Sequence, residues 1–488
     1  MDPIFLNKTC DPFDPRETPC QIGAYVQYAV NVSSPEHVVK TVQFVKEHNI
    51  RFVVKNTGHD FMGRSTGTGA VSVWMHNVKN LTFIDQYNSK SSDFTGTAIK
   101  VGAGVIGGDL AAASHERGLA AVGGECPTVG FAGGYLQGGG HSLLSSAYGL
   151  AADQALEYEV ITTQGDFVHA SPTENEDLYW ALSGGGGGTY GIVWSVTVKA
   201  HKDLPITVGS INFTSESAGS LDKFWQGIDA YQDNNPALLG AKVYYITQYS
   251  QTNGSGSFSL NPIFAVNQSV AEVTALVRPL LDNLEKLDIK YEFGANTIDG
   301  YLPAYDSVGY LRNFPVAATL VDTRIIPRSL WNNNDTLTNF KKTIRGIVES
   351  GVLVFDWIQQ PSLEVAEVSE TQNAVLPAWR DMAKLFGSII PLFDGESVEQ
   401  QRTDRNRMGT DVVAPLKEFT SGGSGATYGN EAHPDDPNWK VAIYGSTYDR
   451  LLSIKDKWDP DQVLYGAVSV GGDRWRETGE GRLCRVDQ

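Results

Sequence analysis

The chain has 488 residues, of which 41% are hydrophobic, and its formal net charge is −18. A chain of this length can bury two or three hydrophobic cores. Its acidic surface disfavours nucleic acid and anionic membranes as partners, and no apolar run approaches the roughly 18 residues that a bilayer span requires.

The amino-terminal region begins with two cysteines. Cys10 and Cys20 bracket a proline-rich segment and can close a short disulfide loop. Residues 25–32 alternate as in a strand, and residues 34–45 show helical spacing after a serine N-cap with proline at the first helical position. Residues 51–54 are a short apolar run. These residues predict a strand, a helix and a second strand, in that order.

The loop of residues 55–67 follows that second strand. It combines glycine, hydroxyl, amide and basic side chains, so it can direct several N–H donors and a cation towards a diphosphate. His59 lies in this loop. Without further context, an ordinary loop histidine is the simpler interpretation of that residue.

Two short motifs match the signatures of other families. Residues 63–67 fit the hydrolase pattern G-x-S-x-G, but that elbow needs a helix straight after it, and residues 68–70 begin none. Residues 102–107 fit G-x-G-x-x-G between a strand and a helix, at 98–101 and 109–117. A Rossmann site also needs a second parallel strand that ends in an acidic residue about 20 residues on, whereas a glycine-rich loop stands there. We interpret the second match as a strand-to-helix turn.

Residues 123–140 are the stretch around which the chain is organised. Glycines recur throughout it, and Cys126 lies within it, followed by a proline. Such backbone exposes N–H groups that can lie against a flat ring or a pyrophosphate. A glycine-rich surface loop is the alternative, but here Phe131, Tyr135 and Leu136 alternate with the glycines. We interpret the stretch as one wall of a buried cofactor site.

A hairpin, a helix and another strand come next. Residues 156–163 and 167–170 predict the hairpin, and residues 173–182 predict a helix with an acidic first turn. Five consecutive glycines, at 184–188, lead into a strand at 192–200. They again indicate backbone that packs against a flat group.

From about residue 202 the composition changes. The glycine runs stop, and strands at 243–249 and 257–266 alternate with amphipathic helices at 269–287 and 335–349. This pattern predicts a second α+β domain, an antiparallel sheet with helices on one face.

The tail returns to the earlier character, with Tyr-Gly-Asn-Glu-Ala at 428–432 and a helix at about 450–458. The His59 loop, the Cys-Pro-Thr-Val-Gly core, the glycine run up to residue 191 and the ending Lys-Asp-Lys-Trp-Asp-Pro occur here in one order. Together they resemble a fungal berberine-bridge-enzyme-like FAD-linked oxidoreductase, of the vanillyl-alcohol-oxidase or PCMH type.

The resemblance implies an α+β fold with a two-lobed PCMH-type FAD-binding domain at 1–201, whose lobes meet near residue 97. A substrate domain at 202–425 would cover the substrate pocket, and a C-terminal segment at 426–488 would return to the FAD domain. In this family, a histidine and a cysteine at the positions of His59 and Cys126 bond covalently to the flavin. We therefore expect FAD as the cofactor, linked through both residues.

The implied cofactor site follows the motifs above. Its expected residues are Lys55, Asn56, Thr57, Gly58, His59, Asp60, Ser65, Gly67, Cys126, Val129, Gly130, Gly133, Gly134, Gly138, Gly139, His141, Leu150, Gly188, Gly191, Ile192, Val193, Tyr428 and Asn430. Lys55 stands where many relatives carry arginine, so the charge is kept but the bidentate fork is lost. We assign no metal ligand.

The residue types fit this chemistry. A cysteine in a turn of N–H donors can act as a thiolate nucleophile, and a histidine nitrogen can add to an activated ring methyl. Tyr428 and Glu431 are the candidates for the catalytic base, although an ordinary strand-turn explains them nearly as well. In the resembling family, the position of Val129 lies near the oxygen-reacting carbon of the flavin. A valine there leaves a small pocket for O₂, whereas simple packing is the alternative role.

We expect an oxidase that takes a hydride from an alcohol, sugar or secondary metabolite and passes electrons to O₂, giving H₂O₂. One alternative is oxidative or pericyclic ring closure of a natural product, and another is a dehydrogenase with a different acceptor. A glycosylated binding protein with a vestigial flavin is the alternative outside enzymes.

Sequons and cysteines predict an extracellular protein, and we also expect a monomer. The Asn-x-Ser/Thr sequons are dense enough to indicate passage through the secretory pathway, with glycans at some of Asn7, Asn31, Asn80, Asn212, Asn253, Asn267 and Asn334. No signal peptide is evident after Met1, so we expect a mature amino terminus. Four cysteines suggest two disulfides, but if Cys126 is committed to flavin, Cys484 remains unpaired.

Overall fold

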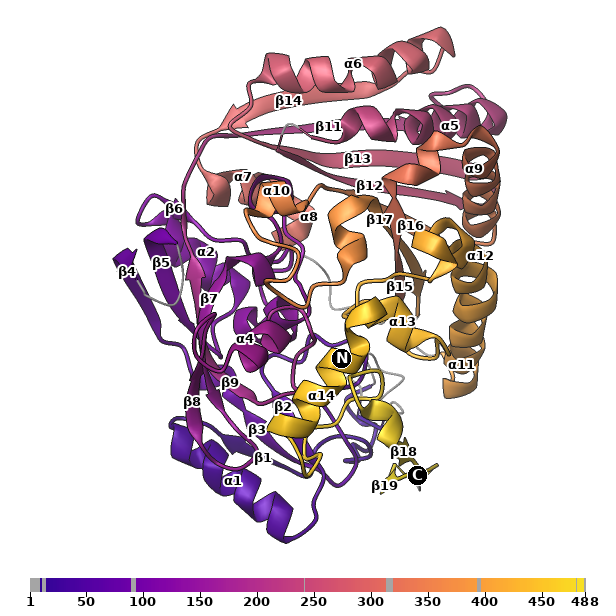
Figure 1. Cartoon of the computed structure of the whole chain (residues 1–488). Coiled ribbons are helices and arrows are strands. Elements are labelled where there is room, and N and C mark those ends of the chain that lie inside the picture. Colours follow the sequence, from indigo (N-terminus) through magenta and orange to yellow (C-terminus); the bar gives the residue numbers. More distant parts are fainter. Residues whose placement is uncertain are drawn as a thin grey trace.

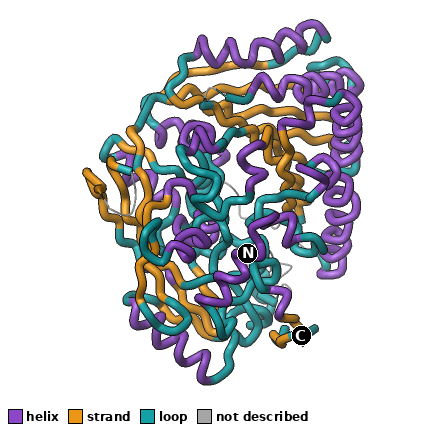
Figure 2. Tube along the Cα trace, viewed as in Figure 1, coloured by secondary structure: helices purple, strands orange, loops and turns teal. Residues whose placement is uncertain are grey.

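The computed structural model describes residues 9–10, 15–88, 94–240, 242–312, 319–392, 396–479 and 481–486. Their strands form sheets of three, five and seven strands, with two short strand pairs besides. In Figure 1 the two smaller sheets lie at the lower left and the seven-stranded sheet at the upper right. Loops and turns occupy much of the region between them, as Figure 2 shows. This architecture confirms the predicted α+β class.

A three-stranded parallel sheet forms the first part of the chain, in the order β1–β3–β2. Its strands are β1 (Tyr28–Asn31), β2 (Phe52–Lys55) and β3 (Val71–Trp74). Helix α1 (Pro35–Glu47) packs on this sheet through an apolar stripe that includes Val38, Val42 and Val45. The helix begins at Pro35, as predicted, although Ser34 makes no side-chain capping bond.

A five-stranded antiparallel sheet follows, in the order β4–β5–β9–β7–β8. Its strands are β4 (Leu81–Asn88), β5 (Thr95–Gly102), β7 (Ala155–Ile161), β8 (Phe167–Ala170) and β9 (Ile192–Lys199). The hairpin β7–β8 confirms the prediction, and helix α4 (Glu176–Leu182) is shorter than predicted.

Neither misleading motif forms the structure that its signature requires. Strand β5 pairs antiparallel with both neighbours, so residues 102–107 only turn the chain into helix α2 (Gly107–His115). Residues 63–67 form a bend, a turn and irregular backbone, and no helix follows them before β3. The hydrolase elbow and the Rossmann unit are therefore both excluded.

The seven-stranded sheet is antiparallel throughout, in the order β14–β11–β13–β12–β16–β17–β15. Its strands are β11 (Ile206–Thr214), β12 (Val243–Thr252), β13 (Ser255–Val266), β14 (Glu292–Ile298), β15 (Thr319–Pro327), β16 (Leu353–Ile358) and β17 (Met382–Pro391). Helices α5 (Leu221–Leu238), α6 (Val270–Lys286) and α9 (Asn334–Glu349) cover one face (Figure 1). This confirms the predicted sheet with helices on one side.

Alternation along the strands separates the two faces of this sheet. On β16, Val354 and Ile358 join the core beneath the helices, whereas Trp357 joins the core shared with the first half of the chain. On β12, Tyr245 and Ile246 divide in the same way. The face without helices is therefore available to cover a site on the first half.

The C-terminal segment returns to the first half of the chain, as predicted. Leu464 pairs with Phe52 in a parallel bridge at the edge of β2. Helix α14 (Tyr448–Trp458) carries Lys455, which is buried and donates to the carbonyl oxygens of Thr189 and Leu464 at 3.1 and 2.9 Å. The domain limits at 201 and 425 and the lobe boundary near 97 stay predictions.

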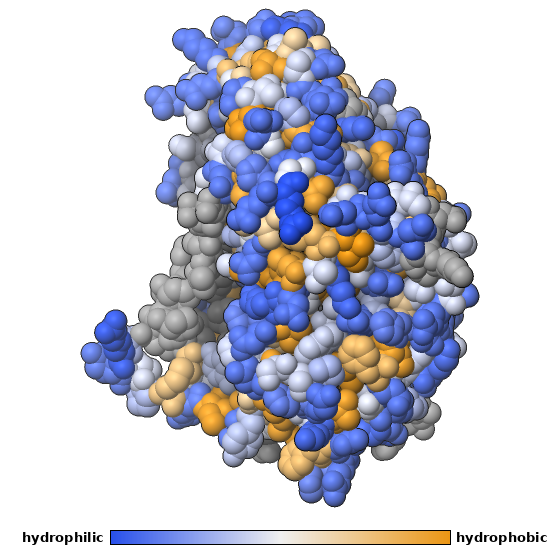
Figure 3. All heavy atoms as spheres, turned by 90° about the vertical axis from the view of Figure 1, so that its left-hand side faces the viewer, coloured by the Kyte–Doolittle hydropathy of each residue, from blue (hydrophilic) through white to orange (hydrophobic). Residues whose placement is uncertain are grey.

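Shorter elements complete the described chain. They are α3 (Ser145–Tyr148), α7 (Tyr301–Ser307), α8 (Gly309–Arg312), α10 (Leu363–Ala366), α11 (Val398–Arg407), α12 (Ala414–Leu416), α13 (Trp439–Tyr444), β6 (Leu119–Ala120), β10 (His201–Lys202), β18 (Trp475–Glu477) and β19 (Leu483–Arg485). Within the described ranges, no helix is both long and apolar enough to cross a membrane. On the face in Figure 3, hydrophobic residues are scattered between hydrophilic ones.

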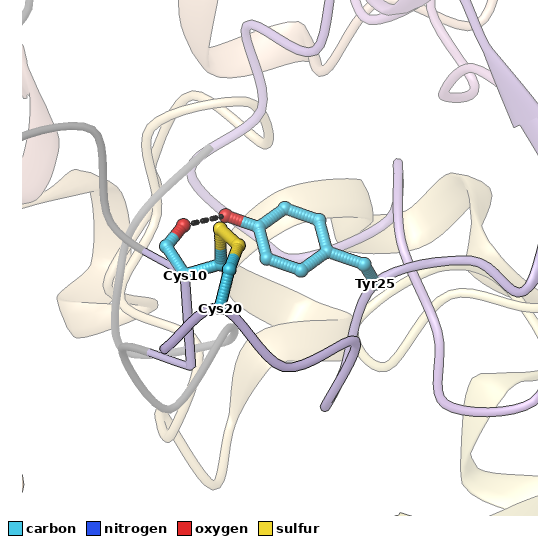
Figure 4. The surroundings of a disulfide bond; sticks show 3 residues. All are labelled: Cys10, Cys20 and Tyr25. Carbon is cyan, nitrogen blue, oxygen red and sulfur yellow. Dashed lines mark hydrogen bonds between the residues drawn. A yellow bond between two sulfur atoms is a disulfide. The ribbon is translucent and has the colours of Figure 1, made fainter. Parts of the chain in front are cut away.

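One disulfide joins Cys10 to Cys20, as predicted, and Cys126 and Cys484 are free thiols. The hydroxyl of Tyr25 donates to the carbonyl oxygen of Cys10 at 2.8 Å (Figure 4). This hydrogen bond connects the disulfide-linked cysteines to the residues just before β1.

Candidate functional site

A cavity of about 340 Å³ lies where the sheets and the C-terminal segment meet. Its wall includes β2, the loop after it, the central glycine-rich stretch and the glycines before β9. Strands β9, β12, β15, β16 and β17, helix α8, residues 428–431 and residues 464–469 supply most of the rest. Most of the motifs singled out in the sequence therefore meet at one place.

Two potential nucleophiles converge on one hydroxyl group in this wall. His59 Nε2 lies 2.6 Å from Thr128 Oγ1, and Cys126 Sγ lies 3.5 Å from the same oxygen. The His59 side chain is partly exposed, yet the surrounding protein removes enough water to lower the pKa of its imidazole. The imidazole is therefore neutral near pH 7 and has a lone pair with which it can attack an electrophile.

Bare backbone forms another part of the wall. A Cβ on Gly187 would lie 2.7 Å from the Cα of Gly134, so two glycine segments approach each other more closely than any side chain would permit. A Cβ on Gly130 would collide with the side-chain amide of Asn56. Gly133, in contrast, has no atom within 4 Å of where its Cβ would stand. The result is an open cradle that a flat ring can enter.

Asp60 organises the loop after β2. Its carboxylate accepts hydrogen bonds from the backbone N–H groups of Arg64 and Ser65 and pairs with the Arg64 guanidinium at 2.9 Å. Burial opposes the charge of Arg64, but Asp60 outweighs burial and raises the pKa of the guanidinium. Arg64 also donates to Asn430 Oδ1 at 3.1 Å. Among the cavity-lining residues that the structure describes, Arg64 is the only lysine or arginine.

Three buried acceptor atoms at the cavity have no hydrogen-bond partner within the described part of the chain. They are Asn56 Oδ1, Gln137 Oε1 and Glu431 Oε2. Unpaired buried acceptors are costly, so a bound group that donates to them would be stabilised. FAD carries such donors, and together with the glycine cradle and Arg64 these atoms fit it.

Four side chains form a second group, which we call the acid–histidine cluster: Glu125, His141, Tyr244 and Glu431. His141 Nδ1 lies 3.0 Å from the Tyr244 hydroxyl, and Tyr244 donates to Glu125 Oε1 at 2.6 Å. His141 Nε2 lies 3.5 Å from Glu431 Oε1. The cluster thus holds one imidazole between two carboxylates at the cavity wall.

Burial and charge shift the protonation of this cluster. Burial raises the pKa of Glu125 despite the nearby imidazole. Burial alone would lower the pKa of His141, but the hydrogen bond that its Nε2 donates to Glu431 and the charges of both carboxylates raise it. Burial and the Glu125 charge raise the pKa of Tyr244 well above its ordinary value. These surroundings therefore stabilise the imidazolium form of His141 relative to water, and Tyr244 remains a hydrogen-bond donor.

Aromatic rings enclose the imidazole of His141. The ring centroids of Trp357, Trp379 and Tyr428 lie 5.8, 6.3 and 5.4 Å from that of His141. Trp357 Nε1 also donates to Glu125 Oε2 at 3.2 Å. Because rings replace water here, the interactions between the charged groups are stronger than they would be at the surface.

Most of the predicted cofactor residues line the cavity. They are Asn56, Thr57, Gly58, His59, Asp60, Ser65, Cys126, Val129, Gly130, Gly133, Gly134, His141, Gly188, Gly191, Val193, Tyr428 and Asn430. Their roles toward a cofactor stay predictions.

The other predicted cofactor residues stand behind this wall. Lys55 packs its Cε near Gly58, and Gly67 lies against the Arg51 side chain. Leu150 and Ile192 are fully buried in hydrophobic cores. Gly138 packs on the Asn430 amide, and Gly139 takes a positive φ of 113° that favours glycine. These six residues shape the wall and do not line the cavity.

The predicted catalytic candidates also lie at the cavity. Glu431 belongs to the acid–histidine cluster. The Tyr428 hydroxyl accepts a hydrogen bond from Asn430 Nδ2 at 2.7 Å, and burial raises the pKa of this phenol, which stays neutral. Val129 is half-buried in the wall next to the Cys126 turn.

Sequence reasoning missed Arg64, Glu125, Thr128 and Tyr244. Glu125 and Thr128 flank the cysteine in the central stretch, so a local signal for both was present. Arg64 lay in the loop that was expected to offer a cation. Tyr244 lies in β12, a strand with an ordinary alternating pattern more than 100 residues away from the others, and no local pattern marks it.

Comparisons with known proteins show which family the chain resembles. A family model described as FAD binding domain matches residues 26–171, and one described as Berberine and berberine like matches residues 427–471. The chain is 40% identical to FAD-linked oxidoreductase sor8 of Hypocrea jecorina, over 100% of this chain and 82% of that protein. It is 38% identical to Bifunctional decalin synthase calF of Penicillium decumbens, over 100% of this chain and 83% of that protein. The crystal structure of VAO-type flavoprotein MtVAO615 from Myceliophthora thermophila matches with a TM-score of 0.89 and 36% identity, over 99% of this chain and 87% of that one.

Proposed function

Because this chain belongs to the berberine-bridge-enzyme-like FAD-linked oxidoreductases of the vanillyl-alcohol-oxidase type, we propose that it is an oxidase whose FAD is bonded to both His59 and Cys126. The bound FAD would accept a hydride from an alcohol, sugar or secondary metabolite and pass the electrons to O₂, giving H₂O₂. The general activity, FAD-dependent oxidoreduction, follows from membership of the family.

One observation carries the double attachment. His59 Nε2 and Cys126 Sγ come from segments 67 residues apart, yet both lie within 3.5 Å of Thr128 Oγ1. Thr128 engages Nε2 and so leaves Nδ1 as the histidine nitrogen free to form a bond. The lowered pKa of His59 favours the neutral imidazole near neutral pH, and in the tautomer whose Nε2–H donates to Thr128, Nδ1 carries the lone pair.

The rest of the wall would hold the cofactor through non-covalent contacts. The backbone of Gly133, Gly134 and Gly187 leaves room for a planar ring, and Arg64 supplies a cation for a diphosphate. Because Asp60 already pairs with Arg64, the guanidinium is fixed in place before the cofactor arrives.

Glu431 is our candidate for the catalytic base. Its Oε1 faces the His141 imidazole, whereas its buried Oε2 has no partner among the described residues. Oε2 is therefore the oxygen of Glu431 that would accept a proton from a substrate hydroxyl. The neutral Tyr428 phenol can donate a hydrogen bond to the same substrate oxygen.

Acid precipitation of the purified protein tests the attachment. The yellow colour should remain with the polypeptide, and the intact mass should exceed the sequence mass by that of one FAD. Cys126→Ala and His59→Ala should each keep one bond, and the double variant should release its flavin. Colour found entirely in the supernatant of the wild type would contradict the covalent proposal.

Ring closure is a second candidate function. The supporting observation is the 38% identity to a protein named Bifunctional decalin synthase calF. Anaerobic mixing of the enzyme with candidate substrates, followed by product analysis and peroxide detection in air, separates the alternatives. An oxidised product with peroxide supports the oxidase, an isomeric cyclised product supports ring closure, and reduction without peroxide supports a dehydrogenase.

We also propose that the protein is a secreted, glycosylated monomer. The asparagines of five sequons are exposed: Asn31, Asn80, Asn253, Asn267 and Asn334. Asn212 is half-buried in β11, where its Oδ1 accepts a hydrogen bond from Ser259, so it is a poorer acceptor for a glycan. Asn7 lies outside the described residues. Peptide mapping before and after endoglycosidase treatment tests these sites.

A further inference from the structure

An apolar region lies on the side of the cavity formed by the seven-stranded sheet, where Thr319 on β15 also belongs to the lining. Six side chains from four strands and helix α8 form it, and we call this region the substrate chamber: Ile246, Leu311, Val321, Phe355, Trp357 and Ile389. Ile246, Leu311 and Trp357 are buried, and the other three are half-buried. Trp357 contacts Phe355 with ring centroids 5.7 Å apart and contacts His141 at 5.8 Å, so the chamber adjoins the acid–histidine cluster.

The strands hold these side chains on the chamber side. Phe355 and Trp357 alternate with Val354 and Ile358, which pack under the helices, so neither aromatic residue can turn away without exposing the opposite core. Gly387 on the neighbouring strand leaves space for the Trp357 indole, because a Cβ there would collide with the ring. The apolar surface is therefore a fixed feature of the fold.

Hydrogen-bonding groups are concentrated at one end of this chamber. Glu125, His141 and Glu431 lie together beside Trp357. Tyr310 also lines the cavity, but its hydroxyl already donates to the carbonyl oxygen of Asn261 at 2.7 Å. A sugar carries hydroxyl groups around its whole ring, and most of them would face hydrocarbon here without a partner.

The charges at the cavity disfavour an anion. The acid–histidine cluster contains two carboxyl groups, of Glu125 and Glu431, but only one basic group, the imidazole of His141. Lys384 lies on the same sheet, but it is fully buried and bonds to Asp356 and Gln232 on the face beneath the helices. Within the described wall, Arg64 is the only lysine or arginine, and we have assigned it to the diphosphate of the cofactor, which leaves no such cation for the substrate.

Resting on the proposed function above, we propose that the substrate is a neutral, largely apolar molecule that presents one hydroxyl group to Glu431. Its hydrocarbon or aromatic body fills the substrate chamber, and its hydroxyl reaches the polar end. Oligosaccharides and carboxylic acids of similar size are excluded, because the chamber offers the former too few hydrogen bonds and the latter two repelling carboxylates.

Calorimetric titration of the holoenzyme tests this proposal without requiring turnover. The probes are benzyl, cinnamyl and naphthylmethyl alcohol, with cinnamate as the anionic match of cinnamyl alcohol and cellobiose as the sugar. Affinity should rise along the alcohol series as the apolar area grows. Cinnamyl alcohol should bind at least tenfold more tightly than either cinnamate or cellobiose. Binding of cellobiose or cinnamate as tight as that of the best alcohol would overturn the proposal, as would binding by none of the alcohols.

A nearly isosteric substitution locates the site. Val321→Thr keeps the size of a half-buried chamber residue but adds a hydroxyl, so it should weaken binding of naphthylmethyl alcohol several-fold. Val208→Thr makes the same change at a half-buried position of β11 outside the cavity, and it should leave the affinity unchanged. Equal affinities for the two variants would show that the chamber is not the binding site.

The outcomes separate this inference from the proposed function. Flavin that cellobiose reduces under anaerobic conditions, with no response to the alcohols, would leave the oxidase standing and refute the apolar chamber. Tight binding of the alcohols to a protein whose flavin no member of the panel reduces would support the chamber and count against the oxidase.

Discussion

Replacing Lys455 by methionine should destabilise the protein through one buried ion pair. Lys455 is 2% exposed and Asp459 is fully buried, with Nζ and Oδ2 2.9 Å apart. The same ammonium donates to the carbonyl oxygens of Thr189, within the glycine run, and Leu464, beside β2. Methionine fills a similar volume but leaves a buried carboxylate and two buried carbonyl groups without this donor.

The structure sets the size of the expected loss. Removing one partner of a buried pair typically costs about 3–5 kcal/mol. Asp459 would still accept backbone N–H bonds from Val463 and Leu464, at 2.9 and 3.0 Å, and these soften the loss of the ammonium. We therefore expect the lower end, about 3 kcal/mol in the free energy of unfolding.

The same helix provides a matched control. Lys457 pairs with Asp177 at 2.7 Å, but its side chain is 60% exposed. Lys457→Met should cost at most about 1 kcal/mol, because solvent screens an exposed pair. Guanidinium unfolding followed by tryptophan fluorescence measures both variants. Equal losses for Lys455→Met and Lys457→Met, or a loss below about 1 kcal/mol for the former, would refute the reasoning.

The double variant Lys455→Met/Asp459→Leu isolates the pair. If the loss comes from an uncompensated carboxylate, removing that carboxylate as well should recover part of it, giving a coupling of about 1–3 kcal/mol. Strictly additive losses would show that packing of the lysine stem, and not its charge, is what stabilises this junction.

Four further predictions concern the proposed flavin site. His59→Ala and Cys126→Ala should each retain flavin through the remaining bond, as intact mass will show, whereas two unmodified polypeptides would contradict the double link. Thr128→Ala should lower the fraction of doubly attached flavin and Thr128→Ser should restore it; tryptic mapping that finds no difference would rule out a positioning role. Val129→Leu should slow reoxidation by O₂ far more than reduction in stopped-flow traces, and a wild-type reduced flavin that persists in air for minutes would point to a dehydrogenase. Because the pKa of His59 is lowered below the ordinary histidine value of about 6.5, more than half of its imidazole is neutral at pH 6.5, so flavin attachment to apoprotein should keep more than half of its maximal rate there; a rate that is half-maximal at pH 6.5 or above would contradict the shift.

Local patterns in the sequence determined much of the fold's inventory. Helix α1 follows from apolar spacing after Pro35, and the hairpin β7–β8 follows from two apolar runs around a short polar turn. The Cys10–Cys20 bridge follows from two cysteines only ten residues apart. These features depend on neighbours along the chain, which is why periodicity and spacing are enough to find them.

The glycine-rich stretches belong to the same class. Runs around Cys126 and before β9 indicated backbone close to a flat group, and the structure places both in one cavity wall. Their local character was visible because a missing Cβ is recorded directly in the sequence. That Gly187 would meet Gly134 was not visible, since the contact joins two separate segments.

Only the tertiary structure assembled the acid–histidine cluster. Glu125, His141, Tyr244 and Glu431 span more than 300 residues, and no local pattern marks Tyr244 or shows that the four side chains meet. The same holds for the substrate chamber, where alternation shows that Phe355 and Trp357 share one face of a strand. It does not show what that face covers.

The physical reason lies in the range of the interactions. Spacing along a chain reports which side chains share a face, because the backbone geometry of helices and strands is local. Which faces meet depends on sheet order, and the order β14–β11–β13–β12–β16–β17–β15 is decided by packing among segments far apart in sequence. The protonation of Glu125 and His141 depends in turn on that packing, because burial and neighbouring charges exist only once those faces have met.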